Sequence, residues 1–358
     1  MVATLKVNKI ESVSASTLAI EGLVIPKVET GSIGNGGRMF IFTDSSGVDW
    51  IVHEFKMGGT FWAPSGGLTA DVLLVGGGGS GGASYGNNDT GEGGGGAGAA
   101  LWRQNFTIAS GGHEIRIGRG GAGATKGVQD STNHKTVMHN GGDTSAFDVI
   151  ARGGGHGGAS DNYNNAAEGG CGGGAGARNS NSGWSTGRSS NQESYTGWTK
   201  YTGSGGNSAN GNYSGGGGGG IGGNGGNQSG STNDSGSQAG SGGAGRDFSS
   251  YFGMTVGHFG WFGGGGGGGT YRHGTNTMYQ APPNNGTSNY GGGGFGGSAR
   301  EGSQTDPNIF ATDKMDGIDG TGGGGGGAVE DHENNEIGGA RSGCGGSGAI
   351  VIRYRLNP

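Results

Sequence analysis

Residues 72–79 read Val72-Leu73-Leu74-Val75-Gly76-Gly77-Gly78-Gly79, so a short apolar stretch runs directly into four glycines. The chain closes in the reverse order, because the glycine-rich residues 343–348 lead directly into Ala349-Ile350-Val351-Ile352-Arg353-Tyr354. Both apolar stretches are short and contain β-branched residues, which is typical of buried β-strands. Glycine tracts framed by strands in this way indicate an ordered domain and not a disordered linker.

Glycine makes up 99 of the 358 residues, and long runs of it recur along the chain. The runs of four or more glycines are 76–79, 93–96, 215–220, 263–269, 291–294 and 322–327. Glycine loses more backbone entropy on ordering than any other residue. Polyproline-II-like helices offset this loss when they pack side by side, because their N–H and C=O groups point outward and pair with neighbours. The runs therefore predict a polyglycine-II helix lattice, and their consecutive glycines exclude collagen.

The strand pattern predicts a mainly β fold. Apolar or alternating stretches at 38–43, 50–55, 60–63, 70–75, 101–108 and 114–117 are separated by Gly, Ser, Pro and Asp, which is typical of an antiparallel β-sandwich. We expect four regions. They are an N-terminal attachment or oligomerisation segment (1–36), a β-sandwich with the first glycine tracts (37–151), a lattice with recognition loops (152–347) and a closing strand (348–358).

Composition and charge narrow the class of protein. The net charge is −6 without a basic run, which disfavours nucleic-acid binding. The N-terminus lacks the apolar stretch of a signal peptide, and no segment reaches the length of a transmembrane helix. We expect synthesis in a cytoplasm and release by lysis, as for a virion component. The strands of residues 1–36 are too short for a monomeric core, so we expect them to form a homotrimer.

No motif of a hydrolase, zinc protease or nucleotide-binding loop occurs, so the sequence predicts a protein that is not an enzyme and has no cofactor. Asp313, Asp316 and Asp319 offer oxygen ligands for Ca²⁺, but their spacing is not that of an EF-hand loop, and a solvated acidic turn is the alternative. Cys171 and Cys344 lie in glycine tracts. They are interpreted as free thiols, and a disulfide between them stays open.

Recognition has to come from the inserts between glycine tracts, because glycine offers no side chain to a ligand. The longest insert, residues 177–214, combines aromatic residues with Ser, Thr, Asn and Gln, which suits the flat apolar faces and hydroxyls of sugars. The candidate receptor-binding residues are Trp184, Tyr195, Trp198, Tyr201, Tyr213, Tyr271, Tyr279 and Tyr290. The alternative is that these aromatics pack over the lattice edge or between subunits. Phe259, Trp261 and Phe262 are instead expected in a core.

Three stretches resemble the glycine-rich domain of bacteriophage tail-fibre proteins. They are residues 59–75 (GTFWAPSGGLTADVLLV), residues 142–155 (GDTSAFDVIARGGG) and residues 345–354 (GGSGAIVIRY). A similar domain occurs in the anaplastic lymphoma kinase receptor family, where polyglycine helices interrupt a jelly-roll-like sandwich. Residues 3–12 are similar to the opening of fibre proteins from phages of marine bacteria. The resemblance implies a jelly-roll-like sandwich and a virion location.

The resemblance and the residues together predict a tail-fibre adhesin. Its loops would bind a bacterial surface glycan or an outer-membrane protein, and residues 1–36 would attach it to other virion tail proteins. Two alternatives stay open: a purely structural virion fibre or capsid-decoration protein without a receptor, and an ice-binding protein that presents ordered Thr or Ala faces on flat polyglycine bundles.

Overall fold

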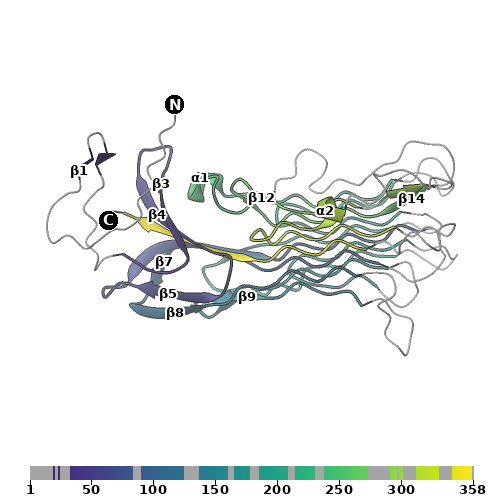
Figure 1. Cartoon of the computed structure of the whole chain (residues 1–358). Helices are drawn as coiled ribbons and strands as arrows, with labels where there is room; N and C mark the ends of the chain where they lie inside the picture. Colours follow the sequence, from purple (N-terminus) through teal and green to yellow (C-terminus); the bar gives the residue numbers. More distant parts are fainter. Residues whose placement is uncertain are drawn as a thin grey trace.

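The structure of the protein is a computed structural model. The described residues are 19–20, 23–24, 33–83, 90–124, 137–159, 165–177, 185–208, 214–229, 238–272, 291–296, 298–300, 312–329 and 341–356. The chain is mainly β, as the sequence predicts, and the strands of its main sheet lie at one end of a long bundle of extended segments (Figure 1). Of the region 1–36, β1 (Ala19–Ile20) and β2 (Leu23–Val24) form a small hairpin, and its expected role in trimerisation stays a prediction.

A six-stranded antiparallel sheet forms the base of the molecule. In order of pairing, its strands are β11 (Thr199–Tyr201), β7 (Ala100–Ile108), β6 (Leu68–Val75), β16 (Ala349–Arg355), β4 (Asp49–Phe55) and β3 (Arg38–Thr43). The closing strand β16 inserts between β4 and β6, so the last described segment completes the centre of the sheet. Residues 71–75 of β6 are all buried. This run is apolar except for Asp71 because both faces of the sheet are covered.

Two apolar cores lie on opposite faces of this sheet. On one face, β5 (Gly59–Ala63) pairs with β8 (Gly111–Ile115), and β9 (Thr144–Ala146) pairs with β10 (Val149–Ala151). Backbone hydrogen bonds between Arg116 and Ser145 join these two pairs into one β layer, which buries Phe61, Leu74 and Ile352 beneath it. The expected sandwich is consistent with these two layers, and its jelly-roll connectivity stays a prediction.

The other face is covered by a short helical turn, α1 (Ser249–Phe252), and by the hairpin of β12 (Arg246–Asp247) and β13 (Trp261–Phe262). Phe252 and Phe262 are fully buried there beside Trp102. The expected core position of Phe262 is therefore confirmed, and Trp261 is partly buried. The expectation for Phe259 is wrong: it occupies a tight turn with a φ of 53° and is 53% exposed.

The remaining elements are small. They are the parallel pair of β14 (Thr270–Arg272) and β15 (Ser298–Arg300), and the helical turn α2 (Thr312–Met315).

The glycine tracts bond to their neighbours with a period of three residues. Successive N–H groups of residues 76–82 point in turn to three neighbouring segments, 93–99, 139–142 and 343–346, at N···O distances of 2.8–3.0 Å. The donor and acceptor pairs are 76–99, 79–96 and 82–93 for the first, 77–142 and 80–139 for the second, and 78–346 and 81–343 for the third. A helix with three residues per turn gives its outward N–H groups this period. Polyglycine II is our interpretation of that bonding.

Close packing on several sides explains why these positions are glycine. A Cβ atom added at Gly94, Gly217 or Gly266 would lie closer than 3.0 Å to a backbone carbonyl oxygen of a neighbouring segment. Tracts before and after residue 152 bond to one another, for example through Gly96 N–H to the Gly155 oxygen at 2.8 Å. The tracts expected in regions 37–151 and 152–347 therefore belong to one bonded body.

Asn and Asp side chains accept hydrogen bonds where a backbone neighbour is missing at the lattice surface. They do so in pairs three residues apart, which matches the period of the backbone. The pairs are Asn140 and Asp143, which accept from the N–H groups of His156 and Gly153; Asn224 and Asn227, which accept from Ser204 and Asn207; and Asp316 and Asp319, which accept from Cys344 and Ser347. These side chains take the place of carbonyl groups at the edge.

Candidate binding surfaces

The segments that flank the undescribed inserts lie together at the end of the lattice away from the main sheet. Isolated β-bridges join Ser185 to Ser208, Ser214 to Thr270, Gly91 to Val329 and Ser229 to Gln238. A small cluster of buried Ala83, Ala124 and Ala328 with Met138 joins further flanks. In Figure 1, β14 marks this end, and β5 and β8 mark the opposite one. The described flanks of several inserts therefore meet at a common end of the lattice.

Several of the predicted binding residues belong to these connections. Trp184, Tyr213, Tyr279 and Tyr290 lie outside the described residues, and so does the side chain of Tyr271 in β14. Other stretches outside the described residues also contain aromatic residues in the sequence, namely Tyr85, Tyr163 and Phe310. These residues are not among the predicted binding residues, because each insert was considered separately and only the described flanks relate the inserts to one another.

The other three predicted residues are at the opposite end, beside the sheet. Tyr201 belongs to β11 at the sheet edge, and the Arg246 guanidinium carbon lies 3.9 Å from the centroid of its ring. Trp198 is half-buried, with its ring centroid 5.5 Å from that of Phe106. Tyr195 and Trp198 both pack against the core beneath β5 and β8. The structure thus does not bring these three residues together with the lattice-end inserts.

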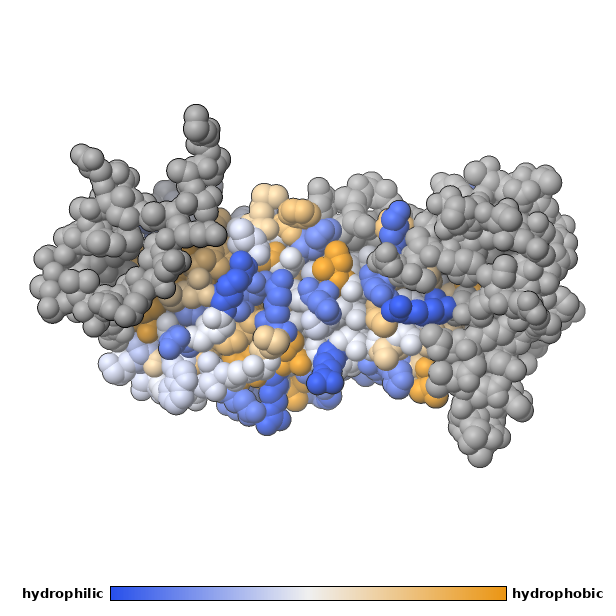
Figure 2. Space-filling view, viewed as in Figure 1, coloured by the Kyte–Doolittle hydropathy of each residue, from blue (hydrophilic) through white to orange (hydrophobic). Residues whose placement is uncertain are grey.

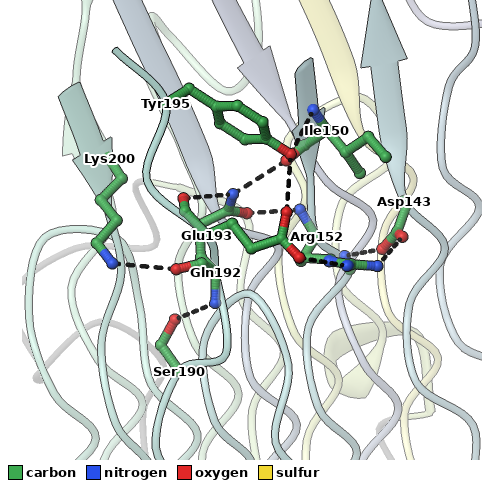
Figure 3. A network of polar contacts seen from close by, with 9 residues as sticks. Asp143, Ile150, Arg152, Ser190, Gln192, Glu193, Tyr195 and Lys200 are labelled. Carbon is green, nitrogen blue, oxygen red and sulfur yellow. Dashed lines mark hydrogen bonds and ion pairs between the residues drawn. The ribbon is translucent and has the colours of Figure 1, made fainter. Parts of the chain in front are cut away.

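A polar network holds the segment that carries Tyr195 (Figure 3). The Arg152 guanidinium pairs with Asp143 at 3.0 Å and with Glu193 at 2.9 Å. The Tyr195 hydroxyl donates to Glu193 at 3.2 Å and accepts from the Ile150 N–H at 3.3 Å. The bond to Arg152 lowers the pKa of Glu193, and burial raises the pKa of Tyr195. These contacts indicate that Tyr195 has a structural role in the fold.

Gln192 completes this network from a buried position. Its side-chain oxygen accepts from the Arg152 N–H at 2.7 Å, and its side-chain nitrogen donates to the Ile150 carbonyl at 3.0 Å. Lys200 Nζ donates to the Gln192 carbonyl at 3.0 Å. Residues 190–200 are thereby fastened to β10, which explains how a polar segment without a run of apolar residues becomes ordered.

A half-exposed aromatic group surrounds Trp198. Phe106 contacts the rings of both Trp198 and Phe147, with centroids 5.5 Å apart in each case, and Arg103 stacks over Phe106 at 4.8 Å. The chain turns sharply at Phe147, where φ is 53°. Phe106 and Phe147 are not predicted as neighbours of Trp198 from the sequence, because they belong to a strand and a hairpin turn distant from residue 198 in the chain.

The acidic residues considered for a metal have structural partners. Asp316 pairs with Arg341 at 2.9 Å and accepts from the Cys344 N–H at 2.7 Å, and Asp319 accepts from the Ser347 N–H at 2.8 Å. The side chain of Asp313 lies outside the described residues. No group of three or more potential metal ligands occurs among the residues that the structure describes.

Both cysteines are free thiols, and a disulfide between them is absent. Cys171 is fully buried in the lattice, and burial raises the pKa of its thiol to about 12. Cys344 is partly exposed and accepts from Arg341 at 3.3 Å.

A cleft of about 590 Å³ lies at the end of the sheet, lined in part by Trp50, Asn105 and Arg355. The Asp71 carboxylate in its wall is engaged by Arg353 at 2.8 Å and by the Asn105 N–H at 3.0 Å. The buried carboxylate is thus paired with a cation and hydrogen-bonded, as a buried charge requires.

The profile of a family described as a glycine-rich domain matches residues 56–261, more than half of the chain. The chain belongs to this glycine-rich domain family. The matched part of the glycine-rich domain starts immediately before β5 and ends at β13, so it includes three of the six strands of the main sheet, β6, β7 and β11, and the glycine tracts between them and β13. No curated protein matches the chain. No helix among the described residues is both long and apolar enough to cross a membrane.

Proposed function

We propose that this chain is an adhesin of the tail-fibre type that binds a bacterial surface glycan or outer-membrane protein through inserts at one end of its lattice. The observation that supports the proposal is the gathering of the insert flanks at the end away from the main sheet. Connections that start from neighbouring flanks can contribute to one binding surface, and their sequences can vary without disturbing the glycine packing.

Aromatic residues of these connections are the proposed receptor contacts. Trp184, Tyr213, Tyr279 and Tyr290 each stand next to or near Ser, Thr, Asn or Gln in the sequence. Such neighbours supply hydrogen bonds beside a flat apolar face. Several weak contacts at one end of the molecule raise the overall affinity for the receptor through avidity. The homotrimer that we propose raises this affinity further. In this proposal residues 1–36 attach the chain to other virion tail proteins.

The surface of the lattice favours this proposal over ice binding. An ice-binding face needs rows of Thr or Ala, whereas Arg119, His139 and Glu168 are exposed on lattice segments. On the face seen in Figure 2, hydrophilic residues are scattered over the described middle of the molecule. A structural fibre without a receptor is the second candidate, and it is distinguished by experiment.

The test compares the two groups of aromatics. The labelled full-length chain is incubated with a panel of Gram-negative cells and their outer-membrane vesicles. We expect the double variant Trp184→Ala, Tyr213→Ala to bind at least about tenfold more weakly, because each stacking contact contributes on the order of 1–2 kcal/mol. The matched variant Trp198→Ala should keep binding and lower the melting temperature.

Equal binding by the double variant and the wild-type chain would overturn the assignment to these residues. Absence of binding by the wild-type chain to every cell and vesicle would favour the structural fibre.

A further inference from the structure

The two edges of the six-stranded sheet differ in how they are protected. β11 is an edge of three residues that includes Lys200, and both a short edge and an edge lysine discourage pairing with another chain. β3 is an edge of six residues, and no charged residue stands between Arg38 and Thr43. Among the described residues, no strand other than β4 pairs with β3.

The side chains of β3 are apolar on both faces of the strand. Phe40 and Phe42 are partly buried and pack against the core that contains α1. Met39 and Ile41 point to the opposite face, where they are 57% and 52% exposed. An open strand edge with exposed apolar side chains is a template for an additional strand.

The hairpin between β3 and β4 fixes which backbone groups of β3 are open. The Asp44 N–H donates to the Val48 carbonyl at 2.9 Å, and the register continues with Thr43 opposite Asp49. Hydrogen-bonded and non-bonded pairs alternate in an antiparallel ladder. Residues 38, 40 and 42 therefore bond to β4, whereas residues 39, 41 and 43 direct their N–H and C=O groups away from the sheet.

We infer that β3 pairs antiparallel with β3 of a second copy of this chain across a two-fold axis at Ile41. In such a pairing, the outward N–H and C=O groups of one copy have to bond to the outward groups of the other. Residues 39, 41 and 43 of one copy can therefore stand opposite only residues 39, 41 and 43 of the second copy. The register centred on Ile41 brings all three into pairs: Met39 with Thr43 of the copy, Ile41 with Ile41, and Thr43 with Met39.

The same register is favourable for the side chains. It places Arg38 opposite Asp44 of the copy, so the two ends of the pairing carry opposite charges and not like ones. Phe40 then lies opposite Phe42, and aromatic pairs across strands are stabilising. On the other face, Met39 and Ile41 of both copies come together and lose their exposure to water. This two-fold contact is separate from the association expected of residues 1–36.

Disulfide trapping in the full-length chain tests the contact, with Cys344→Ser in the background to remove the accessible native thiol. The Cα atoms of a hydrogen-bonded antiparallel pair lie about 5.5 Å apart, within the range that a disulfide spans. Ile41→Cys should therefore form a covalent dimer in most chains under mild oxidation. Met57→Cys is the matched control, because Met57 is 80% exposed and lies outside β3.

A second experiment tests the register of the pairing, and it remains available if Ile41→Cys does not fold. Met39→Cys mixed with Thr43→Cys should give covalent dimers of the two variants, whereas Met39→Cys alone should not. Ile41→Lys should abolish association through this edge in sedimentation, and Met57→Lys should leave it intact.

Two results would overturn the inference. One is cross-linking of Ile41→Cys no greater than that of Met57→Cys. The other is protection of the thiol introduced by Ile41→Cys from alkylation without dimer formation, which would indicate that the chain's own residues cover the edge.

Discussion

Replacement of Gly266 by valine tests whether the glycine tracts are a packed lattice. Gly266 lies within the longest run, and its N–H donates to the Gly95 oxygen at 3.0 Å, while its own oxygen accepts from the Gly218 N–H at 2.8 Å. A Cβ atom at this position would meet the carbonyl oxygen of Gly325 closer than 3.0 Å. That neighbour is backbone and cannot rotate away, so the segments have to separate.

The magnitude follows from the hydrogen bonds that separation breaks. Each buried bond left without a partner costs about 1–3 kcal/mol, so the two bonds of Gly266 together cost roughly 2–6 kcal/mol. Folded domains have a total stability of about 5–15 kcal/mol. With about 2 °C for each kcal/mol in a large chain, the melting temperature should fall by roughly 4–12 °C.

The matched control is Gly66→Val, because a Cβ atom at Gly66 would meet nothing within 4 Å. Thermal unfolding of both variants is followed by circular dichroism. Gly217→Val should behave like Gly266→Val, since its Cβ atom would meet the Ser241 carbonyl. If Gly266→Val and Gly217→Val melt together with Gly66→Val, the tracts are not packed as described.

Three further outcomes are expected. Asn227→Ala removes the acceptor of the Asn207 N–H and should lower the free energy of unfolding in urea by about 1 kcal/mol, which Asn227→Asp should largely restore; an unchanged value would contradict the capping role. Burial lowers the pKa of His53, so the unfolded chain binds the proton more tightly, and stability should decline as the pH falls below about 6.5; His53→Gln should flatten this dependence. In the native chain a thiol reagent should modify Cys344 and spare Cys171, whose pKa is raised to about 12, and both should react in denaturant; rapid native reaction of Cys171 would contradict its burial.

The sequence predicted the strands well, because their signals are local. The stretches expected at 38–43, 70–75 and 101–108 correspond to β3, β6 and β7 with shifts of at most two residues at their ends. Each begins or ends at glycine, proline or a polar turn, and each has the apolar pattern of a strand buried on one or both faces. β11 escaped prediction, because Thr199–Tyr201 is too short and polar to differ from a loop.

The aromatic candidates show where local reasoning stops. Trp184 and Trp198 are 14 positions apart within one insert of the sequence, yet Trp198 packs beside the main sheet, and the flank at Ser185 lies at the other end of the lattice. An extended segment of a few residues spans a long distance because each residue advances by about 3 Å. Closeness in the sequence is therefore a poor guide to closeness in a lattice of extended segments.

The sequence by itself determined the class of fold, since glycine runs framed by apolar strands leave only disorder or backbone packing, and strands have no use in a disordered linker. The sequence also contains the surface pairs of Asn and Asp three residues apart, although the N–H groups that they bond to belong to neighbouring segments that the sequence does not identify. Only the tertiary structure decided which tract bonds to which. Glycines are identical, and they have no side chains that would favour one neighbouring tract over another. The same holds for the common end of the inserts and the open edge of β3, which arise from the order in which distant segments lie side by side.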